Sequence, residues 1–340
     1  MSTSKEQEGL FPFLPTEILS QILSDVCFEP TDSYHQSLVN KKFSQTVQQK
    51  LYQRISLTSS QPKAWELLLR TLRGNALLLP LVHHLGLESA PNREWAAIPE
   101  SIGMALKEIL GLRLPALESL TWKPSQINMS VYEIDPMLPV RYVHVNRVSL
   151  EQAATLMLLP YIEKIHIGYI NDAVTLRNSV QAPSASSLVG RGARFSPVKD
   201  IRINSGWNPH AILSPFVNWP RELKSFHVSI VVVGGLSPIS VDRCLEPVKE
   251  SLEVLSVKAI TDDYTVVDGT FIYFEKFKYL KRLNTSASLL FGGSWSSPSA
   301  ERAGLYRRLP ATLETLTVGY TAMARFLLSQ MLIGQIDFLR

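Results

Sequence analysis

One spacing of apolar residues recurs along most of the chain: apolar, two residues, apolar, one residue, apolar. Alternating apolar residues over so short a stretch are typical of a half-buried β-strand. Successive copies from residue 117 onward begin 22 to 36 residues apart, so the pattern predicts one strand per unit, with connectors of uneven length. The copies are "LESLTW" from 117, "VRYVHV" from 140, "IEKIHI" from 162, "VKDIRI" from 198, "LKSFHV" from 223, "LEVLSV" from 252 and "LETLTV" from 313, with more degenerate copies at 52, 82 and 280.

The segments between these strands carry helix signals of different strength. Residues 99–111 open with a proline, repeat apolar residues at helical spacing and end at a glycine, which predicts a helix. Residues 149–159 begin with Ser149 and have Gln152 three residues later, the spacing of a capping box. Residues 208–219 contain an internal proline and predict a poorer helix. The chain therefore alternates strand and connector.

A single strand with its connector cannot bury its own apolar face, so such units must stack and share a core. Leucine-rich repeats fit this pattern best. We therefore expect an α/β chain whose residues 58–340 form an irregular leucine-rich-repeat solenoid, a horseshoe. The usual repeat has Asn or Cys three residues after the last strand leucine, and without that asparagine ladder the curvature should be uneven. At those positions this chain has Ser125, Val148, Ile170, Gly206, Val231, Ile260, Ser288 and Thr321.

Composition limits the cellular setting and the partners. The chain has 340 residues, 45% of them hydrophobic, and a formal net charge of +4, too small without a clustered basic patch to indicate nucleic-acid binding. The longest apolar runs fall short of the roughly 20 residues that a membrane span needs. Cys27 and Cys244 are far apart and form no CxxC pair, which fits a reducing compartment. Because the first nine residues resemble no secretory signal, we expect a cytoplasmic and/or nuclear location.

Sequence signatures of catalysis are missing. There is no GxSxG elbow, no HExxH and no glycine-rich phosphate loop, and "GRGARF" lacks the lysine and hydroxyl that such a loop needs. Asp262 and Asp263 could act as paired carboxylates, but adjacent aspartates more often initiate a loop or cap a helix. The sequence predicts a non-catalytic protein without metal or cofactor; an enzyme on an α/β framework is the minor alternative.

Two amphipathic segments precede the strands. Residues 14–26, "LPTEILSQILSDV", place Ile18, Ile22 and Val26 on one helix face, with a proline in the first turn. Residues 37–52 space apolar residues four apart, with lysines and glutamines between them. The apolar stripe is wide for so small a unit. It is explained either as the N-terminal cap of the following core or as a docking surface for another protein.

Residues 13–57 resemble an F-box. The resemblance rests on the "LPTEIL" opening, the Ile22–Leu23 pair, an "EPTD" turn, the "LVNKKF" segment and the closing "LYQRISL". The remainder resembles the degenerate leucine-rich repeats of filamentous fungal F-box proteins, notably in "FEKFKYLKRL" and "LPATLETLTV". On this resemblance we expect a disordered tail at 1–10, a short all-helical F-box module at 11–57 and the repeat domain at 58–340.

The resemblance implies the substrate-recognition subunit of an SCF-type (Skp–cullin–F-box) ubiquitin ligase. The F-box would bind the Skp adaptor, and through it cullin, while the repeats present a protein substrate. A protein-interaction scaffold that acts without the ligase is the alternative. The motif positions that contact the adaptor, or support that contact, match Leu14, Pro15, Ile18, Ile22, Phe43 and Leu51.

Strand alternation also predicts which residues point away from the core, because successive side chains on a strand face opposite sides. The residue between the last two apolar positions forms an outward column: Thr121, His144, His166, Arg202, His227, Ser256, Asn284 and Thr317. This face predicts a surface for an acidic or phosphorylated protein segment, although an exposed strand face is polar in any case. A metal site at His144 and His166 lacks further ligands. The candidate substrate-facing residues are Lys123, His144, Lys164, His166, Arg202, His227, Lys258 and Arg282.

Overall fold

The computed structural model describes residues 48–89, 98–123, 135, 137–170, 194–204, 209–230, 238–259, 272–286, 289–290 and 308–319. Their strands are β1 (Arg54–Thr58), β2 (His84–Glu88), β3 (Ser119–Trp122), β4 (Tyr142–Val148), β5 (Lys164–Ile170), β6 (Asp200–Ile203), β7 (Ser225–Ile230), β8 (Val254–Ala259), β9 (Arg282–Ser286) and β10 (Thr315–Gly319). Their helices are α4 (Pro62–Gly74), α5 (Glu100–Leu110), α6 (Leu150–Leu156), α9 (Pro209–Asn218) and α10 (Pro238–Leu245). Short 3-10 segments are η1 (Ala76–Leu81), η3 (Glu246–Val248) and η4 (Phe274–Lys276).

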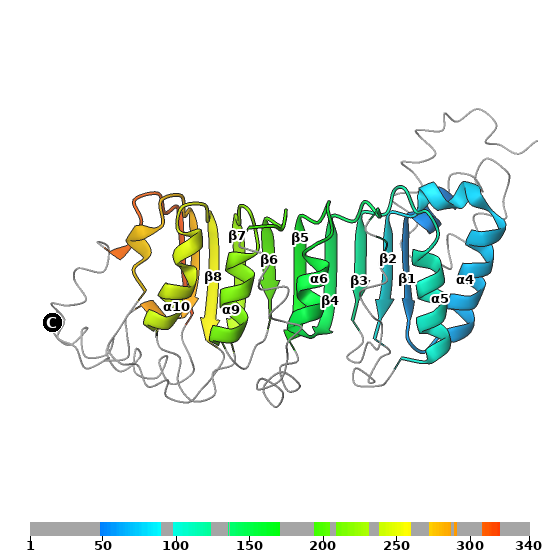
Figure 1. The fold of residues 1–340 in the computed structure, drawn as a ribbon, viewed down its shortest axis with the longest axis horizontal. Helices are drawn as coiled ribbons and strands as arrows, with labels where there is room; N and C mark the ends of the chain where they lie inside the picture. The colour runs from blue at the N-terminus through cyan, green and yellow to red at the C-terminus, as the bar shows by residue number, and fades with distance from the viewer. Residues whose placement is uncertain are drawn as a thin grey trace, which may run out of the picture.

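The described strands form one ten-stranded sheet in which every pairing is parallel and the strand order follows the chain order, β1 to β10. Figure 1 shows this sheet as an elongated layer running the length of the molecule, with the helices along one of its faces. All strands predicted from the apolar spacing are present, including those at the degenerate copies near 52, 82 and 280. The predictions of strand positions are confirmed.

The core lies between the sheet and the helices. In β4, Val143 and Val145 are buried, whereas Tyr142 and His144 on the opposite face are partly exposed. The same alternation in β5 buries Ile165, although Thr121 of β3 and Ser256 of β8 are buried on the other face and β10 is largely exposed on both. Helix α4 packs on α5, and α9 packs on α10. Burying one such aliphatic side chain stabilises the fold by about 1.5 to 3 kcal/mol. None of the described helices lies on the other face of the sheet, which we call the open face.

The connectors follow their sequence signals in most places. Helix α5 occupies the segment predicted at 99–111, and α6 begins after Ser149 with both hydrogen bonds of the capping box. Residues 209–218 form the regular helix α9 although Pro215 lies inside it. The buried side chains of Leu213, Phe216 and Val217 explain why this helix forms despite the proline, because packing overrides propensity.

The fold class expected from the sequence is wrong. The chain from β1 to β10 is an α/β fold built on a ten-stranded all-parallel sheet with alternating helices, and the described residues contain neither an all-helical F-box nor a leucine-rich-repeat horseshoe. The expectation was a horseshoe made irregular by the absence of an asparagine ladder at the turns. Here the order of the units comes from the strands themselves, which pair in register with their neighbours, and from helices of 7 to 13 residues on one face.

The N-terminal boundary also shifts. Residues 48–53 are helical, in agreement with the end of the second predicted helix, but residues 54–57 belong to β1 and not to a helical module. β1 pairs with β2 over its whole length, from Arg54 with His84 to Thr58 with Glu88. The sheet therefore starts inside the segment assigned to the F-box, and residues 1–47 lie outside the described part.

Candidate functional site: the open face of the sheet

On the face of the sheet that carries none of the described helices, one residue from each strand lies beside its register partner on the next strand, and we call these residues the central row. The pairings are in register, so that His144 lies beside His166, His166 beside Arg202, and Arg202 beside His227. The outward column predicted from the sequence is thus aligned across the sheet. The complete central row is Ser56, Gly86, Thr121, His144, His166, Arg202, His227, Ser256, Asn284 and Thr317.

The remaining candidate substrate-facing residues lie two positions before or after the central row. Lys123 follows β3 and pairs with Glu88 of β2, with 2.7 Å between Nζ and Oε2. Arg202 in the central row contacts Asp200 at 3.4 Å. Lys164, Lys258 and Arg282 are exposed, and no ion pair is formed by these three within the described residues. All eight candidates therefore lie on this face, spread over β3 to β9.

The rows of this face carry more basic than acidic side chains. At the central row and the positions two residues on either side, the described strands and Lys123 place six basic groups and two carboxylates. The basic residues are Arg54, Lys123, Lys164, Arg202, Lys258 and Arg282, and the acidic residues are Glu88 and Asp200. An exposed face with this balance favours a partner of opposite charge.

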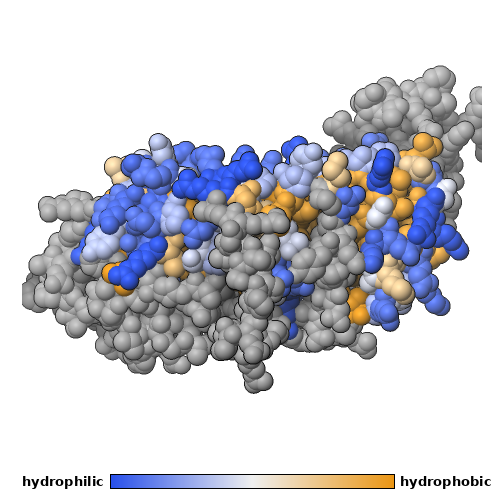
Figure 2. All heavy atoms as spheres, in the orientation of Figure 1, coloured by the Kyte–Doolittle hydropathy of each residue, from blue (hydrophilic) through white to orange (hydrophobic). Residues whose placement is uncertain are grey.

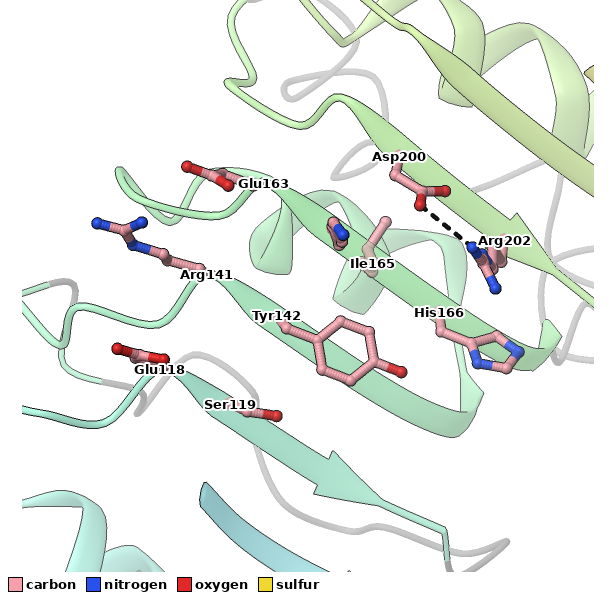
Figure 3. Close-up of a pocket in the computed structure, with 10 residues that line it drawn as sticks. Glu118, Ser119, Arg141, Tyr142, Glu163, Ile165, His166, Asp200 and Arg202 are labelled. Carbon is pink, nitrogen blue, oxygen red and sulfur yellow. Dashed lines mark hydrogen bonds and ion pairs between the residues drawn. The ribbon is translucent and has the colours of Figure 1, made fainter. Parts of the chain in front are cut away.

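A depression of about 460 Å³ is sunk into this face over β3 to β6. Figure 3 shows its lining side chains standing on neighbouring strands, with the Asp200–Arg202 contact at one end and Glu118 and Arg141 at the other. The lining residues are Glu118, Ser119, Arg141, Tyr142, Glu163, Lys164, Ile165, His166, Asp200 and Arg202. Its walls therefore combine charges of both signs with a phenol, a hydroxyl and an imidazole.

Glu118, Arg141 and Glu163 were not among the predicted site residues, and they belong to a second line of residues at the start of the strands. We call it the edge row: His83, Glu118, Arg141, Glu163, Lys199, Lys224, Glu253, Lys281 and Glu314. Each member from Glu118 onward donates its backbone N–H to the carbonyl oxygen of the member before it, at 2.8 to 2.9 Å. The signal was available, because a charged residue follows the first apolar position of nearly every repeat copy.

The signs in the edge row alternate over most of its length. Glu253 is flanked by Lys224 and Lys281, each at 3.3 Å, and their hydrogen bonds lower the pKa of the Glu253 carboxyl. Figure 2 shows hydrophilic residues along much of the upper border, where the strands begin. This border is therefore largely charge-balanced within itself, unlike the open face below it.

The imidazoles of His144 and His166 stack in the central row, with ring centroids 4.1 Å apart and planes inclined by 8°. Burial, the neighbouring His166 ring and Lys123 lower the pKa of His144 to about 4. Burial lowers the pKa of His166 as well, partly offset by a hydrogen bond with Asn204. Both rings are therefore neutral at pH 7, and the positive charge of this face comes from its lysines and arginines.

Two more histidines of this face are neutral for the same reason. Burial lowers the pKa of His84, whose Nδ1 is 3.0 Å from Ser119 Oγ. Burial and then Arg202 lower the pKa of His227, whose Nε2 is 2.9 Å from Ser225 Oγ. These two rings thus have a local hydroxyl partner. The stacked pair differs, because His166 Nε2 is buried without a hydrogen-bond partner.

The described residues contain no cluster of metal ligands and no helix that could span a membrane. No three His, Cys, Asp or Glu side chains among them are grouped to hold a metal ion. Within the same ranges, no helix combines the length and apolar character needed to cross a membrane. Of the predicted adaptor contacts, Leu51 lies in the helical residues 48–53 and is partly exposed. Leu14, Pro15, Ile18, Ile22 and Phe43 lie outside the described residues.

Comparison with known proteins supplies no further guide. No protein-family model matches the chain, and a search of curated proteins finds no match either. The sequence motifs and the open face therefore remain as the indications of function.

Proposed function

We propose that this protein is the substrate-recognition subunit of an SCF-type ubiquitin ligase and contributes no catalytic group of its own. The segment 11–57 carries the F-box-like motif and would bind the Skp adaptor. The open face of the sheet would bind the protein substrate and hold it near the ubiquitin-transferring partner enzymes, so the contribution to the reaction is proximity and orientation.

The observation that carries the substrate half of this proposal is the central row, a line of mostly polar residues that crosses ten strands in register with no described helix over it. A rigid sheet presents its side chains at fixed spacing, about 4.8 Å from strand to strand. Such a surface suits an extended protein segment, whose contacts can be distributed over several strands. It suits a single small substrate less well.

The charge balance indicates the kind of segment. Lys164, Lys258 and Arg282 are exposed and form no ion pair within the described ranges, so their charges are available to a ligand. Lysine and arginine bind carboxylates and phosphates through charge-assisted hydrogen bonds. We therefore propose an acidic segment as the substrate element, which the basic excess of the face would also attract over a distance at low ionic strength.

The adaptor half is tested by co-purification of the full chain with the Skp adaptor. The double substitution Ile18→Asp/Ile22→Asp should abolish co-elution, because charges on the apolar stripe cannot enter a protein interface without a large desolvation cost. The matched control is Ser20→Asp/Ser24→Asp, which adds the same charge at polar positions of the same segment and should keep the adaptor bound.

Circular dichroism and thermal melting of both variants check that the sheet is intact. If the Ile18→Asp/Ile22→Asp variant still binds the adaptor, the proposed interface is wrong. If the unaltered chain never binds it while the open face still binds acidic segments, the protein is an interaction scaffold that works without the ligase.

A further inference from the structure

The depression on the open face lies next to the stacked pair of the central row. His166 contributes to its lining and contacts His144 face to face. Two polar atoms of the lining residues, His166 Nε2 and Asp200 Oδ1, are buried and have no hydrogen-bond partner. An unpaired buried polar atom costs about 1 to 3 kcal/mol in general, so its persistence calls for an explanation.

Charged groups surround the stacked pair from every neighbouring strand. Lys123 and Arg202 disfavour a proton on the rings, whereas Glu88 and Asp200 favour one. His227 lies one strand beyond Arg202, and Tyr142 and Lys164 lie two residues before His144 and His166 on the same strands. Burial is the main reason that both rings are neutral without a ligand, and the two carboxylates do not restore a proton because Glu88 is engaged by Lys123 and Asp200 by Arg202.

We propose that the depression over β4 to β6 binds an acidic side chain of an extended peptide and that the His144–His166 stack takes up one proton from solution as this side chain binds. This inference rests on the proposed function, in that the acidic side chain belongs to the segment bound by the open face. It adds the position of one anchoring residue and makes recognition depend on pH.

The side chains that line the depression account for both the binding of an acidic side chain and the uptake of a proton. A carboxylate or phosphate in the depression accepts hydrogen bonds from Lys164 Nζ, and a protonated His166 supplies a further donor. Because Asp200 Oδ1 and His166 Nε2 are screened from solvent, their side chains must turn toward the depression before a backbone N–H of the peptide can reach Asp200 or the ligand can reach His166. Asp200 and His166 lie on neighbouring strands at diagonal positions, because Lys164 pairs with Asp200 and His166 with Arg202. One acidic residue can therefore present its side chain to one and its main chain to the other.

The stack limits the uptake to one proton. A first proton on either ring is favoured by the incoming negative charge, which offsets the effect of Lys123 and Arg202. A second proton would place two imidazolium ions 4.1 Å apart, centroid to centroid, and their repulsion opposes it. The pair therefore titrates as a unit, and the proton resides on one imidazole without any bond to the ligand being made or broken.

Isothermal titration calorimetry on the full chain tests this with the acetylated, amidated hexapeptide of glutamate as probe. Without ligand the pKa of His144 is about 4. If the bound carboxylate restores a pKa of about 6.5, linkage predicts that affinity rises roughly tenfold between pH 7.5 and 5.5. At pH 5.5 the binding enthalpy, plotted against the ionisation enthalpy of the buffer, should give an uptake close to one proton.

The variant His144→Gln/His166→Gln keeps polar side chains of similar size but removes the titrating rings, and it should abolish both the uptake and the pH dependence. His83→Gln in the edge row is the matched control and should leave both unchanged. Proton NMR titration of the histidines in the unaltered chain, with and without the peptide, supplies a measurement that needs no variant.

An affinity that does not change with pH, or an uptake that persists in His144→Gln/His166→Gln, overturns the inference. Equal binding of the glutamine hexapeptide shows instead that the face does not select acidic segments, which removes the proposed substrate class. Binding of inorganic phosphate with the same proton uptake but no binding of the peptide assigns the site to a free anion and refutes the peptide. Adaptor co-purification is independent of all these results.

Discussion

Lys249 offers the sharpest test of the packing behind the open face. Its side chain is 4% exposed and lies between α10 and η4, where Nζ contacts Asp242 at 3.1 Å and Glu246 at 2.6 Å. Asp242 is also nearly buried and accepts a hydrogen bond from the backbone N–H of Tyr273 at 3.3 Å. The ammonium group lies 5.8 Å from the ring centre of Phe277. A single buried cation thus joins two consecutive connectors, the one between β7 and β8 and the one between β8 and β9.

The substitution Lys249→Met keeps the length of the side chain and removes the charge. Asp242 then remains buried without its counter-ion, and breaking such a pair by removing one partner costs about 3 to 5 kcal/mol. Glu246 adds at most about 1 kcal/mol, because its side chain is 65% exposed and its ion pair is screened by water. Since small domains are stable by roughly 5 to 15 kcal/mol, the loss should be easy to measure.

Urea unfolding followed by circular dichroism supplies the free energies for a double-mutant cycle of Lys249→Met, Asp242→Asn and the two together. The double variant should be more stable than the sum of the single losses predicts, because each single substitution leaves the other member of the buried pair without its partner. Lys278→Met is the matched control: Lys278 pairs with Glu250 at 2.7 Å, but both side chains are more than 60% exposed, and its loss should be within error. A cost below about 1 kcal/mol for Lys249→Met would refute the buried-charge argument.

Four further substitutions test local geometry. Gly168→Ala should destabilise the sheet by about 1 to 3 kcal/mol in urea unfolding, because the new Cβ would lie 2.9 Å from the carbonyl oxygen of Asn146. Gly103→Ala in α5 should stabilise the protein by about 0.5 to 1 kcal/mol, because its Cβ meets no atom within 4 Å. A stable Gly168→Ala variant beside a destabilised Gly103→Ala variant would contradict the packing described. Ser149→Ala removes the capping box of α6 and should cost about 1 kcal/mol by the same measurement, and no loss would mean that the cap is dispensable. The pKa of His144 in the folded protein is about 4, below the ordinary 6.5, so its contribution to folding stability is complete above pH 6.5 and is lost as the pH falls toward 4. The melting temperature should therefore decrease less over this pH range in His144→Gln than in the unaltered protein. The same decrease in both proteins is the contrary result.

Much of the sheet could be predicted from the sequence, because its signal is local. The spacing that places Val143 and Val145 two residues apart fixes both the strand and the face on which His144 lies. Since each copy of the pattern has the same phase, alignment of the copies also predicts which residues become neighbours across strands, as His144 and His166 are. The capping-box spacing of Ser149 and Gln152 likewise predicts where α6 begins from four consecutive residues.

The missed features depend on distances that a repeat alignment does not contain. The neutrality of the stacked histidines follows from burial and from Lys123, which belongs to another strand. The buried charge of Lys249 has a partial sequence signal, since Asp242, Glu246 and Lys249 are spaced four and three residues apart. Its contact with Phe277 of the next unit has no such signal. The fold class was misjudged because the strand spacing is shared by different arrangements of parallel strands.

The strand order has a consequence for how the molecule gains and loses structure. Each strand finds its partners in the segments that come just before and just after it in the chain, so no pairing has to wait for distant parts of the polypeptide to meet. Amide exchange should therefore be slowest at the centre, around β5 and β6, and progressively faster toward β10, whose inward-facing Leu316 is 40% exposed. The strands at the two ends of the described sheet would unfold locally more often than β4 and β5, which carry His144 and His166.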